Sequence, residues 1–101
     1  MEDSDKDLRE KLTAEAGPAD WRVLRAHYER GAIFMVAADL DLIEVAVRIA
    51  EDDIKKVETW MGAGKLTRPL PEDAKRWEAE GTIVTALVVA PFVLVQEISN
   101  A

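Results

Sequence analysis

The segment LDLIEVAVRIAEDD, from Leu40 to Asp53, decides how the middle of the chain folds. Asp41 and Glu44 stand at the two positions of a capping box, which predicts a helix beginning directly after Asp41. Leu40 and Val45 occupy the positions of a hydrophobic staple and support the same start. At about 100° per residue, the apolar side chains that follow fill one arc and the charged ones fill the other. The segment therefore predicts an amphipathic helix.

Asp53 indicates that this helix does not run straight on. In a continuous helix to Met61, the Asp53 carboxylate would lie in the middle of the apolar arc, where burial of an unpaired carboxylate is costly. A break at Asp52-Asp53 avoids this cost, with one aspartate capping a second helix to about Ala63 and Gly64 placed after its end. The alternative is an unbroken helix in which Asp53 is a buried functional acid with a shifted pKa.

The other segments alternate between helical and strand patterns. Apolar residues at helical spacing predict helices at residues 8–16, 21–31 and 71–81, the second capped by Asp20. Apolar and β-branched runs predict strands at residues 32–37, 65–68 and 83–95. Pro91 cannot donate a hydrogen bond to a ladder, so it is expected to divide the last strand into two pieces.

The order of these elements, α-α-β-α(α)-β-α-β, predicts the fold class. It is that of one compact α/β (or α+β) domain, with a small three- to four-stranded sheet packed by about four to five helices. Helical crossovers predict that neighbouring strands run parallel. A chain of 101 residues has the size of one domain. We expect this domain to span residues 8–98, after a disordered acidic N-terminus at residues 1–7.

Composition argues against several classes of function. The net charge of −7 would repel a phosphate backbone. The absence of cysteine excludes disulfides, thiolate nucleophiles and cysteine-ligated metals. The longest apolar run, residues 83–95, is shorter than the roughly 20 residues of a membrane-spanning helix, and the acidic N-terminus is unlike a secretory signal. We therefore expect a cytoplasmic protein that binds neither nucleic acid nor membrane.

A likeness to a known family is carried by segments along most of the chain. They are LDLIEVAVRIAEDD at 40–53, Val57-x-x-Trp60-Met61 with Gly64-x-Leu66, VVAPFVLVQE at 88–97, LREKL near Leu8 and DWRVL at Asp20. Together they resemble the bacterial domain-of-unknown-function family 2288, from about residue 8 to residue 97. The resemblance implies a small, stand-alone bacterial cytoplasmic protein. It implies no activity, cofactor or catalytic residue.

Asp39, Asp41 and Asp53 are the candidates for a metal site. Divalent hard cations need several converging oxygen ligands, which these carboxylates could supply. Arg48, however, stands among the acids of the helix and forms an i,i+4 pair with Glu44, which argues against a cation there. Helix capping and solvated ion pairs are the expected roles of the acids. No cofactor is expected.

No constellation of catalytic residues is visible. His27, the sole histidine, has no obvious partner and is expected at the boundary of the core. The serines, Ser4 and Ser99, lie near the termini and outside any GxSxG motif. Gly62 and Gly64 follow a helix rather than a strand, so they are expected to end that helix and not to cradle a phosphate. The sequence predicts no catalytic residue and favours a non-enzymatic protein.

Trp21, Trp60 and Trp77 have two interpretations. They can pack in the core, or they can form an interface, where tryptophan is enriched. The apolar run at 83–95, whose open edge would need covering, supports the second interpretation. The leading hypothesis is therefore an interaction module that binds a protein partner or itself, as a homodimer. The alternative is a protein that binds a small ligand or a divalent metal through the acids around Asp39–Asp53.

Overall fold

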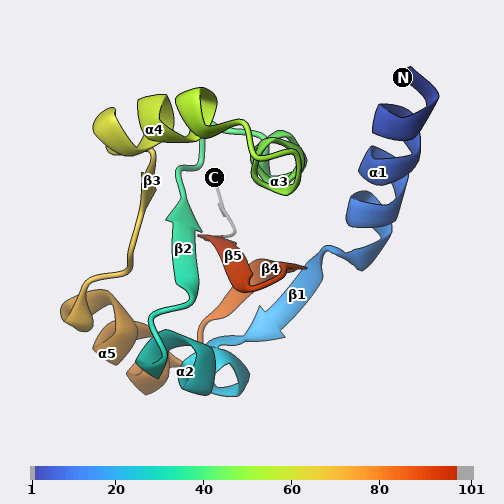
Figure 1. Ribbon diagram of the computed structural model, residues 1–101. Helices are drawn as coiled ribbons and strands as arrows, with labels where there is room; N and C mark the ends of the chain where they lie inside the picture. The colour runs from blue at the N-terminus through green and yellow to red at the C-terminus, as the bar shows by residue number, and fades with distance from the viewer. Residues whose placement is uncertain (1, 98–101) are drawn as a thin grey trace.

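The computed structural model describes residues 2–97, with side chains from Lys6 onward (Figure 1). This part of the chain folds into five helices and five strands. Their order is α1 Glu2–Glu15, β1 Gly17–Asp20, α2 Trp21–Glu29, β2 Ile33–Val36, α3 Leu42–Ala50, α4 Ile54–Gly62, β3 Leu66–Thr67, α5 Pro71–Glu80, β4 Ile83–Val89 and β5 Phe92–Glu97. The expected single α+β domain is thus confirmed in outline, but its sheet has five strands, more than the three or four predicted.

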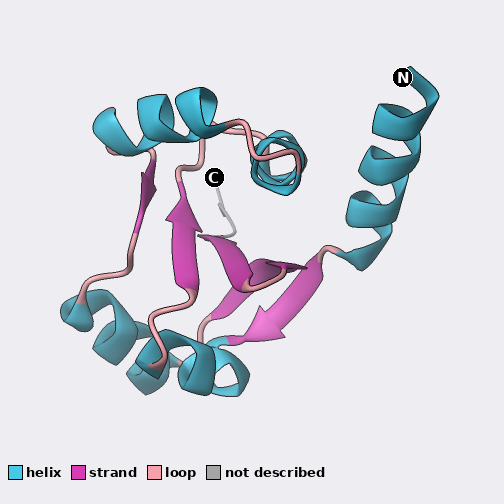
Figure 2. Cartoon of the chain, in the orientation of Figure 1, coloured by secondary structure: helices cyan, strands magenta, loops and turns pink. Residues whose placement is uncertain are grey.

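The sheet is mixed, with the strand order β1-β4-β5-β2-β3 (Figure 2). Only β2 and β5 are parallel, with Phe34 opposite Leu94, and the other three pairs are antiparallel. The expectation of parallel neighbours is therefore correct for one pair and wrong for three. The β4–β5 turn is too short for a crossover. Between β2 and β3 the chain passes through two helices, which return it to enter β3 in the opposite direction.

Helices cover both faces of the sheet, so the core has two parts. In β2 and β5, successive side chains alternate between these parts, as the two-residue period of a strand requires. The part under α1, α3 and α4 includes Leu12, Leu42, Val45, Trp60, Leu87 and Leu94. The part under α2 and α5 includes Trp21, Leu24, Ile33, Trp77, Val93 and Val95. Figure 1 shows α2 and α5 lying together, away from α3 and α4.

The break between α3 and α4 is confirmed. Asp53 caps α4, where its carboxylate accepts a 3.2 Å hydrogen bond from the Lys56 N–H. Two backbone hydrogen bonds end α3. The Asp52 N–H donates to the Ile49 carbonyl at 3.1 Å, and the Asp53 N–H donates to the Arg48 carbonyl at 2.9 Å. These bonds form a Schellman motif with Asp52 in the left-handed position, at φ 56°. Asp53 therefore caps a break and is not a buried acid in a continuous helix.

The N-terminal region differs from the expectation in two ways. First, α1 begins at Glu2, so it includes most of the segment 1–7 that was expected to be disordered; the disorder of that segment stays a prediction. Second, Gly17-Pro18 does not only stop a helix but begins β1, which pairs antiparallel with β4. Pro18 is compatible with a strand here because β1 is at the edge of the sheet, where a missing N–H is tolerated.

The apolar run at 83–95 forms two strands, as Pro91 predicted. The β4–β5 turn is Ala90-Pro91, joined by a cis peptide bond. The expectation that both faces are buried is partly wrong, because Ile83 and Val88 are exposed. The expectation of an open apolar edge is wrong, because β4 and β5 are interior strands and the edges are the short β1 and β3. Among residues 2–97, no helix is both long enough and apolar enough to cross a bilayer.

Candidate functional site

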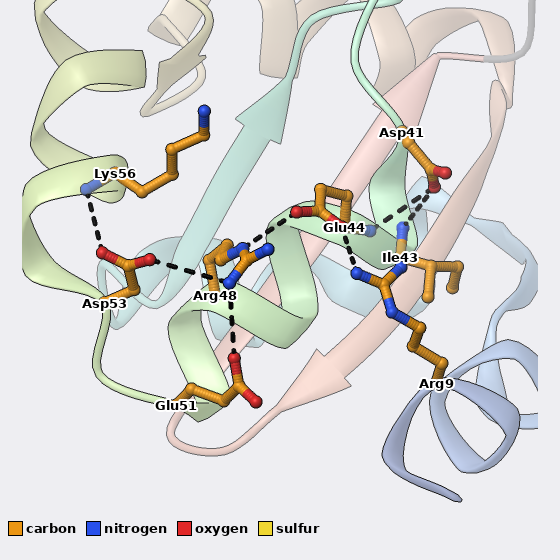
Figure 3. A network of polar contacts seen from close by, with 8 residues as sticks. All are labelled: Arg9, Asp41, Ile43, Glu44, Arg48, Glu51, Asp53 and Lys56. Atoms are coloured by element: carbon orange, nitrogen blue, oxygen red, sulfur yellow. Dashed lines mark hydrogen bonds and ion pairs between the residues drawn. The ribbon is translucent and has the colours of Figure 1, made fainter. Parts of the chain in front are cut away.

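The acids of the Leu40–Asp53 segment are held in a network of ion pairs around α3 (Figure 3). Glu44 pairs with Arg9 of α1 and accepts a 2.8 Å hydrogen bond from Arg48. Arg48 also lies 3.6 Å from Glu51 and 3.8 Å from Asp53. The Arg9 guanidinium first, and then that of Arg48, hold the pKa of Glu44 below its ordinary value. The predicted solvated pairing is confirmed for Glu44 and Glu51.

The predicted capping box at the start of α3 is half formed. Asp41 caps the helix, accepting hydrogen bonds from the Ile43 N–H at 2.9 Å and the Glu44 N–H at 3.4 Å. The Glu44 carboxylate, however, turns to Arg9 and Arg48. That part of the prediction is wrong because charge-assisted hydrogen bonds to guanidinium groups are stronger than a bond to a single neutral backbone N–H.

The metal candidates are not brought together. Asp41 caps the start of α3, and Asp53 caps the start of α4, just after the end of α3. The two carboxylates therefore lie at opposite ends of α3 (Figure 3). Asp39 pairs instead with Lys65, whose ammonium group lowers the pKa of that carboxyl. Among the residues that the structure describes, no group of three or more His, Cys, Asp or Glu could hold a metal ion.

The residues considered for catalysis have structural roles. His27 is half-buried on α2, and its Nδ1 contacts Arg30, so the boundary interpretation is confirmed. Gly64 follows the end of α4 at φ 74°, which confirms the helix stop. Ser99 and the Ser4 side chain lie outside the described part of the chain.

All three tryptophans are buried. Trp21 and Trp77 are 1% exposed, with ring centroids 4.7 Å apart, and Trp60 is 7% exposed. The Trp77 indole N–H donates a 3.0 Å hydrogen bond to Glu97 at the end of β5. This is the core-packing interpretation. It leaves the indoles little surface to offer a partner, so an interface must use other residues.

One hollow of the surface is an apolar groove of about 330 Å³ between α3, α4 and the sheet. Its floor consists of Phe34, Leu66 and Phe92, from three strands. The rings of Phe34 and Phe92 meet edge to face, with centroids 5.3 Å apart. We call this hollow the α4 groove.

The walls of the α4 groove are also apolar. Ile49 of α3 lies on one side, and Ile54, Val57 and Met61 of α4 lie on the other. Ile54 is 64% exposed and Met61 is 46% exposed, whereas Trp60 of the same helix points into the core. The apolar stripe of α4 therefore extends beyond the part that the core covers.

Four charged residues, Arg48, Asp52, Asp53 and Glu58, line the α4 groove. Asp53 alone of these was singled out from the sequence. Sequence reasoning missed the groove because its floor residues, Phe34, Leu66 and Phe92, come from three strands that are far apart in the chain. No local signal separates Ile54 and Met61 from a buried stripe, because the apolar residues of α4 fit one face of a nine-residue helix.

Comparison with known proteins gives the chain a family but no activity. The family model described as protein of unknown function (DUF2288) matches residues 7–97. The chain is similar to the protein in the NMR solution structure of PA1075 from Pseudomonas aeruginosa, with 37% sequence identity and a TM-score of 0.80 over 93% of this chain and 87% of that one. No curated protein matches the chain. The chain therefore belongs to the DUF2288 family of proteins of unknown function.

Proposed function

We propose that this protein is a non-enzymatic interaction module whose docking surface is the α4 groove. The observation that carries the proposal is the exposed apolar strip of Ile54 and Met61 beside a hollow floored by Phe34 and Phe92. Scattered exposed apolar residues are normal on a protein surface, but a contiguous apolar hollow favours a binding site. Covering such a surface contributes about 25 cal/mol for each Å² of apolar area removed from water.

The chemistry of the lining supports binding over catalysis. Apart from one arginine and three carboxylates, the described residues of the groove are apolar. The groove residues include no hydroxyl, thiol, imidazole or amine side chain, so nucleophilic catalysis there would depend on carboxylates alone.

The hollow between α2 and α5 supports the proposal less well. It has a similar volume, about 370 Å³, but its polar lining is greater. Arg25 and Glu78, which line it from opposite helices, are already joined by a 2.8 Å hydrogen bond. Two of the charged groups that could bind a partner in that hollow are therefore already paired with each other.

Self-association is one form of this proposal. Its support from an open strand edge is lost, because β4 and β5 are interior strands. The α4 groove offers another route by which two copies could join. Sedimentation at high micromolar concentration tests this form, and a mass that stays at that of the monomer would exclude it.

The proposal is tested by placing a charge in the groove. Met61→Asp puts a carboxylate on the exposed apolar strip, and Val23→Asp is the matched control. Val23 is 74% exposed on α2, which covers the other face of the sheet. When the chain is immobilised and a lysate of the native cell is passed over it, we expect Met61→Asp to retain at least tenfold less partner protein than the parent. We expect circular dichroism to show that its fold is intact. We expect Val23→Asp to leave retention unchanged. Equal retention by both variants and the parent would overturn the proposal.

A second candidate, binding of a small ligand, is favoured by the volume of the groove. About 330 Å³ lies at the lower end of the range for small-molecule sites. Of the acids expected to serve such a site, Asp53 lines the groove and Asp39 and Asp41 do not. A tight ligand raises the melting temperature by mass action, so a flat thermal-shift response to a broad panel of metabolites and divalent ions would reject this candidate.

A further inference from the structure

The shape of the α4 groove indicates what kind of molecule it binds. Ile54 and Met61, seven residues apart, lie about 10 Å apart along the axis of α4 at 1.5 Å per residue. Val57 lies between them on the same side of the helix, and the phenylalanine floor runs beneath. The strip is thus two helical turns long and open to solvent. Such a strip matches the apolar face of a second short helix, which presents anchors at i, i+3, i+4 and i+7.

The charges of the groove indicate the charge of its partner. Asp52, Asp53 and Glu58 line it against one guanidinium, that of Arg48. Arg48 is already compensated by its contacts with Glu44, Glu51 and Asp53. Neither Asp52 nor Glu58 has an ion pair or side-chain hydrogen bond within the described residues. The mouth of the groove therefore carries two carboxylates that are available to a cation.

We propose that the α4 groove binds a short amphipathic helix of another protein, with apolar anchors flanked by lysine or arginine. This rests on the proposed function and names the class of partner. The flanking cations would pair with Asp52 and Glu58, while the anchors cover Ile54 and Met61. A second copy of the chain is a poor occupant, because two chains each carrying a net charge of −7 repel one another.

The test uses two synthetic helical peptides of about four turns as probes. Both carry leucine at i, i+3, i+4 and i+7; one has lysine at every flanking position and the other has glutamate. Titrations are followed by fluorescence and by amide chemical shifts of the ¹⁵N-labelled full chain. We expect the lysine peptide to bind and to change the amide chemical shifts along α4 and at Phe34 and Phe92. We expect its affinity to fall as the salt concentration is raised. We expect the glutamate peptide not to bind.

Charge variants separate a specific site from general attraction to an acidic protein. Asp52→Asn with Glu58→Gln removes both mouth carboxylates, and asparagine tolerates the left-handed backbone of Asp52. Glu29→Gln with Glu80→Gln removes two exposed carboxylates from α2 and α5, so it changes the net charge equally. We expect the first pair of substitutions to lower the affinity for the lysine peptide about fivefold to tenfold. We expect the second pair to leave its affinity within about twofold.

Each contrary outcome has a distinct meaning. Equal binding of both peptides, or equal loss in both pairs of variants, overturns the basic-helix inference. A concentration-dependent dimer that Met61→Asp dissociates overturns it in favour of a second copy, and the docking surface stands. No binding of either peptide, while Met61→Asp still lowers retention of cellular partners, also overturns the inference and leaves the proposed function intact. Partner retention that Met61→Asp does not change removes the proposed function itself.

Discussion

Arg48 in the last turn of α3 lies 3.8 Å from the carboxylate of Asp53, the residue that caps α4. Asp53 thus has two roles at one corner of the chain (Figure 3). Its backbone N–H donates to the Arg48 carbonyl at the end of α3. Its carboxylate accepts a hydrogen bond from the Lys56 N–H in the first turn of α4. Arg48 and Asp53 both line the α4 groove, so this corner is part of its wall.

The first prediction concerns the cap. Asp53→Ala removes the acceptor of the Lys56 N–H and should lower the free energy of unfolding by about 1 kcal/mol. Asp53→Asn keeps a good N-cap and loses only the ion pair with Arg48, so its loss should be smaller. Urea denaturation monitored by tryptophan fluorescence measures both. An alanine variant as stable as the parent would show that the cap contributes nothing to the fold.

The second prediction concerns the backbone at Asp52. Its φ of 56° lies in the left-handed region, where glycine is favoured. Asp52→Gly should therefore raise the free energy of unfolding by about 0.5–1 kcal/mol. Gly64 holds the equivalent place after α4, at φ 74°, so Gly64→Ala should lower it by about 1 kcal/mol. Chemical denaturation of both variants checks the pair, and changes of the same sign would contradict the strain argument.

The third prediction concerns the buried indole of α5. The Trp77 indole N–H donates to Glu97 Oε1, which also accepts a 2.8 Å hydrogen bond from Arg76. Glu97→Ala leaves a largely buried donor without its acceptor and should cost about 1 kcal/mol or more. Glu97→Gln retains a carbonyl acceptor and should cost less. If thermal unfolding shows equal losses for the two variants, the charge of Glu97 matters more than its role as hydrogen-bond acceptor.

The fourth prediction concerns pH. Hydrogen bonds from Arg22, from its guanidinium first and then its backbone N–H, lower the pKa of Asp20 from 3.8 to about 2. A carboxyl with a depressed pKa in the folded state contributes stability above its unfolded value, and this contribution is lost as pH falls through the folded value. Stability should therefore decline between about pH 4 and pH 2 through this group.

Asp20→Asn is the control for this pH dependence, because asparagine still caps α2 but does not titrate. Its thermal stability should fall less steeply than that of the parent over the same pH range. Identical slopes would mean that the Asp20–Arg22 pair does not couple folding to protonation. An NMR titration of the Asp20 carboxyl measures its pKa directly.

Helix boundaries in this chain follow from short-range chemistry. Caps were expected at Asp20, at Asp41 and at one of Asp52 and Asp53; the caps are Asp20, Asp41 and Asp53. Gly64 ends α4 as expected, and Pro91 divides the last two strands. These features were predictable because the groups that interact are within six residues of one another in the chain, so side-chain type and spacing are enough.

Features that depend on distant partners were not predictable in the same way. The strand at Gly17–Asp20 exists because β4 supplies its hydrogen bonds, and no local pattern announces it. Glu44 leaves its capping-box role because Arg9, thirty-five residues earlier, reaches it from α1. The parallel pairing of β2 with β5 likewise joins segments about sixty residues apart.

The Leu40–Asp53 segment contains both kinds of information. Its sequence alone determined two capped helices with a break between them, because those choices cost or gain free energy within a few residues. The α4 groove arose only when α3, α4 and three strands met, since Phe34 and Phe92 come from strands on either side of that segment in the chain. Packing therefore decided which apolar residues were left facing water, and with them the surface on which we expect the protein to act.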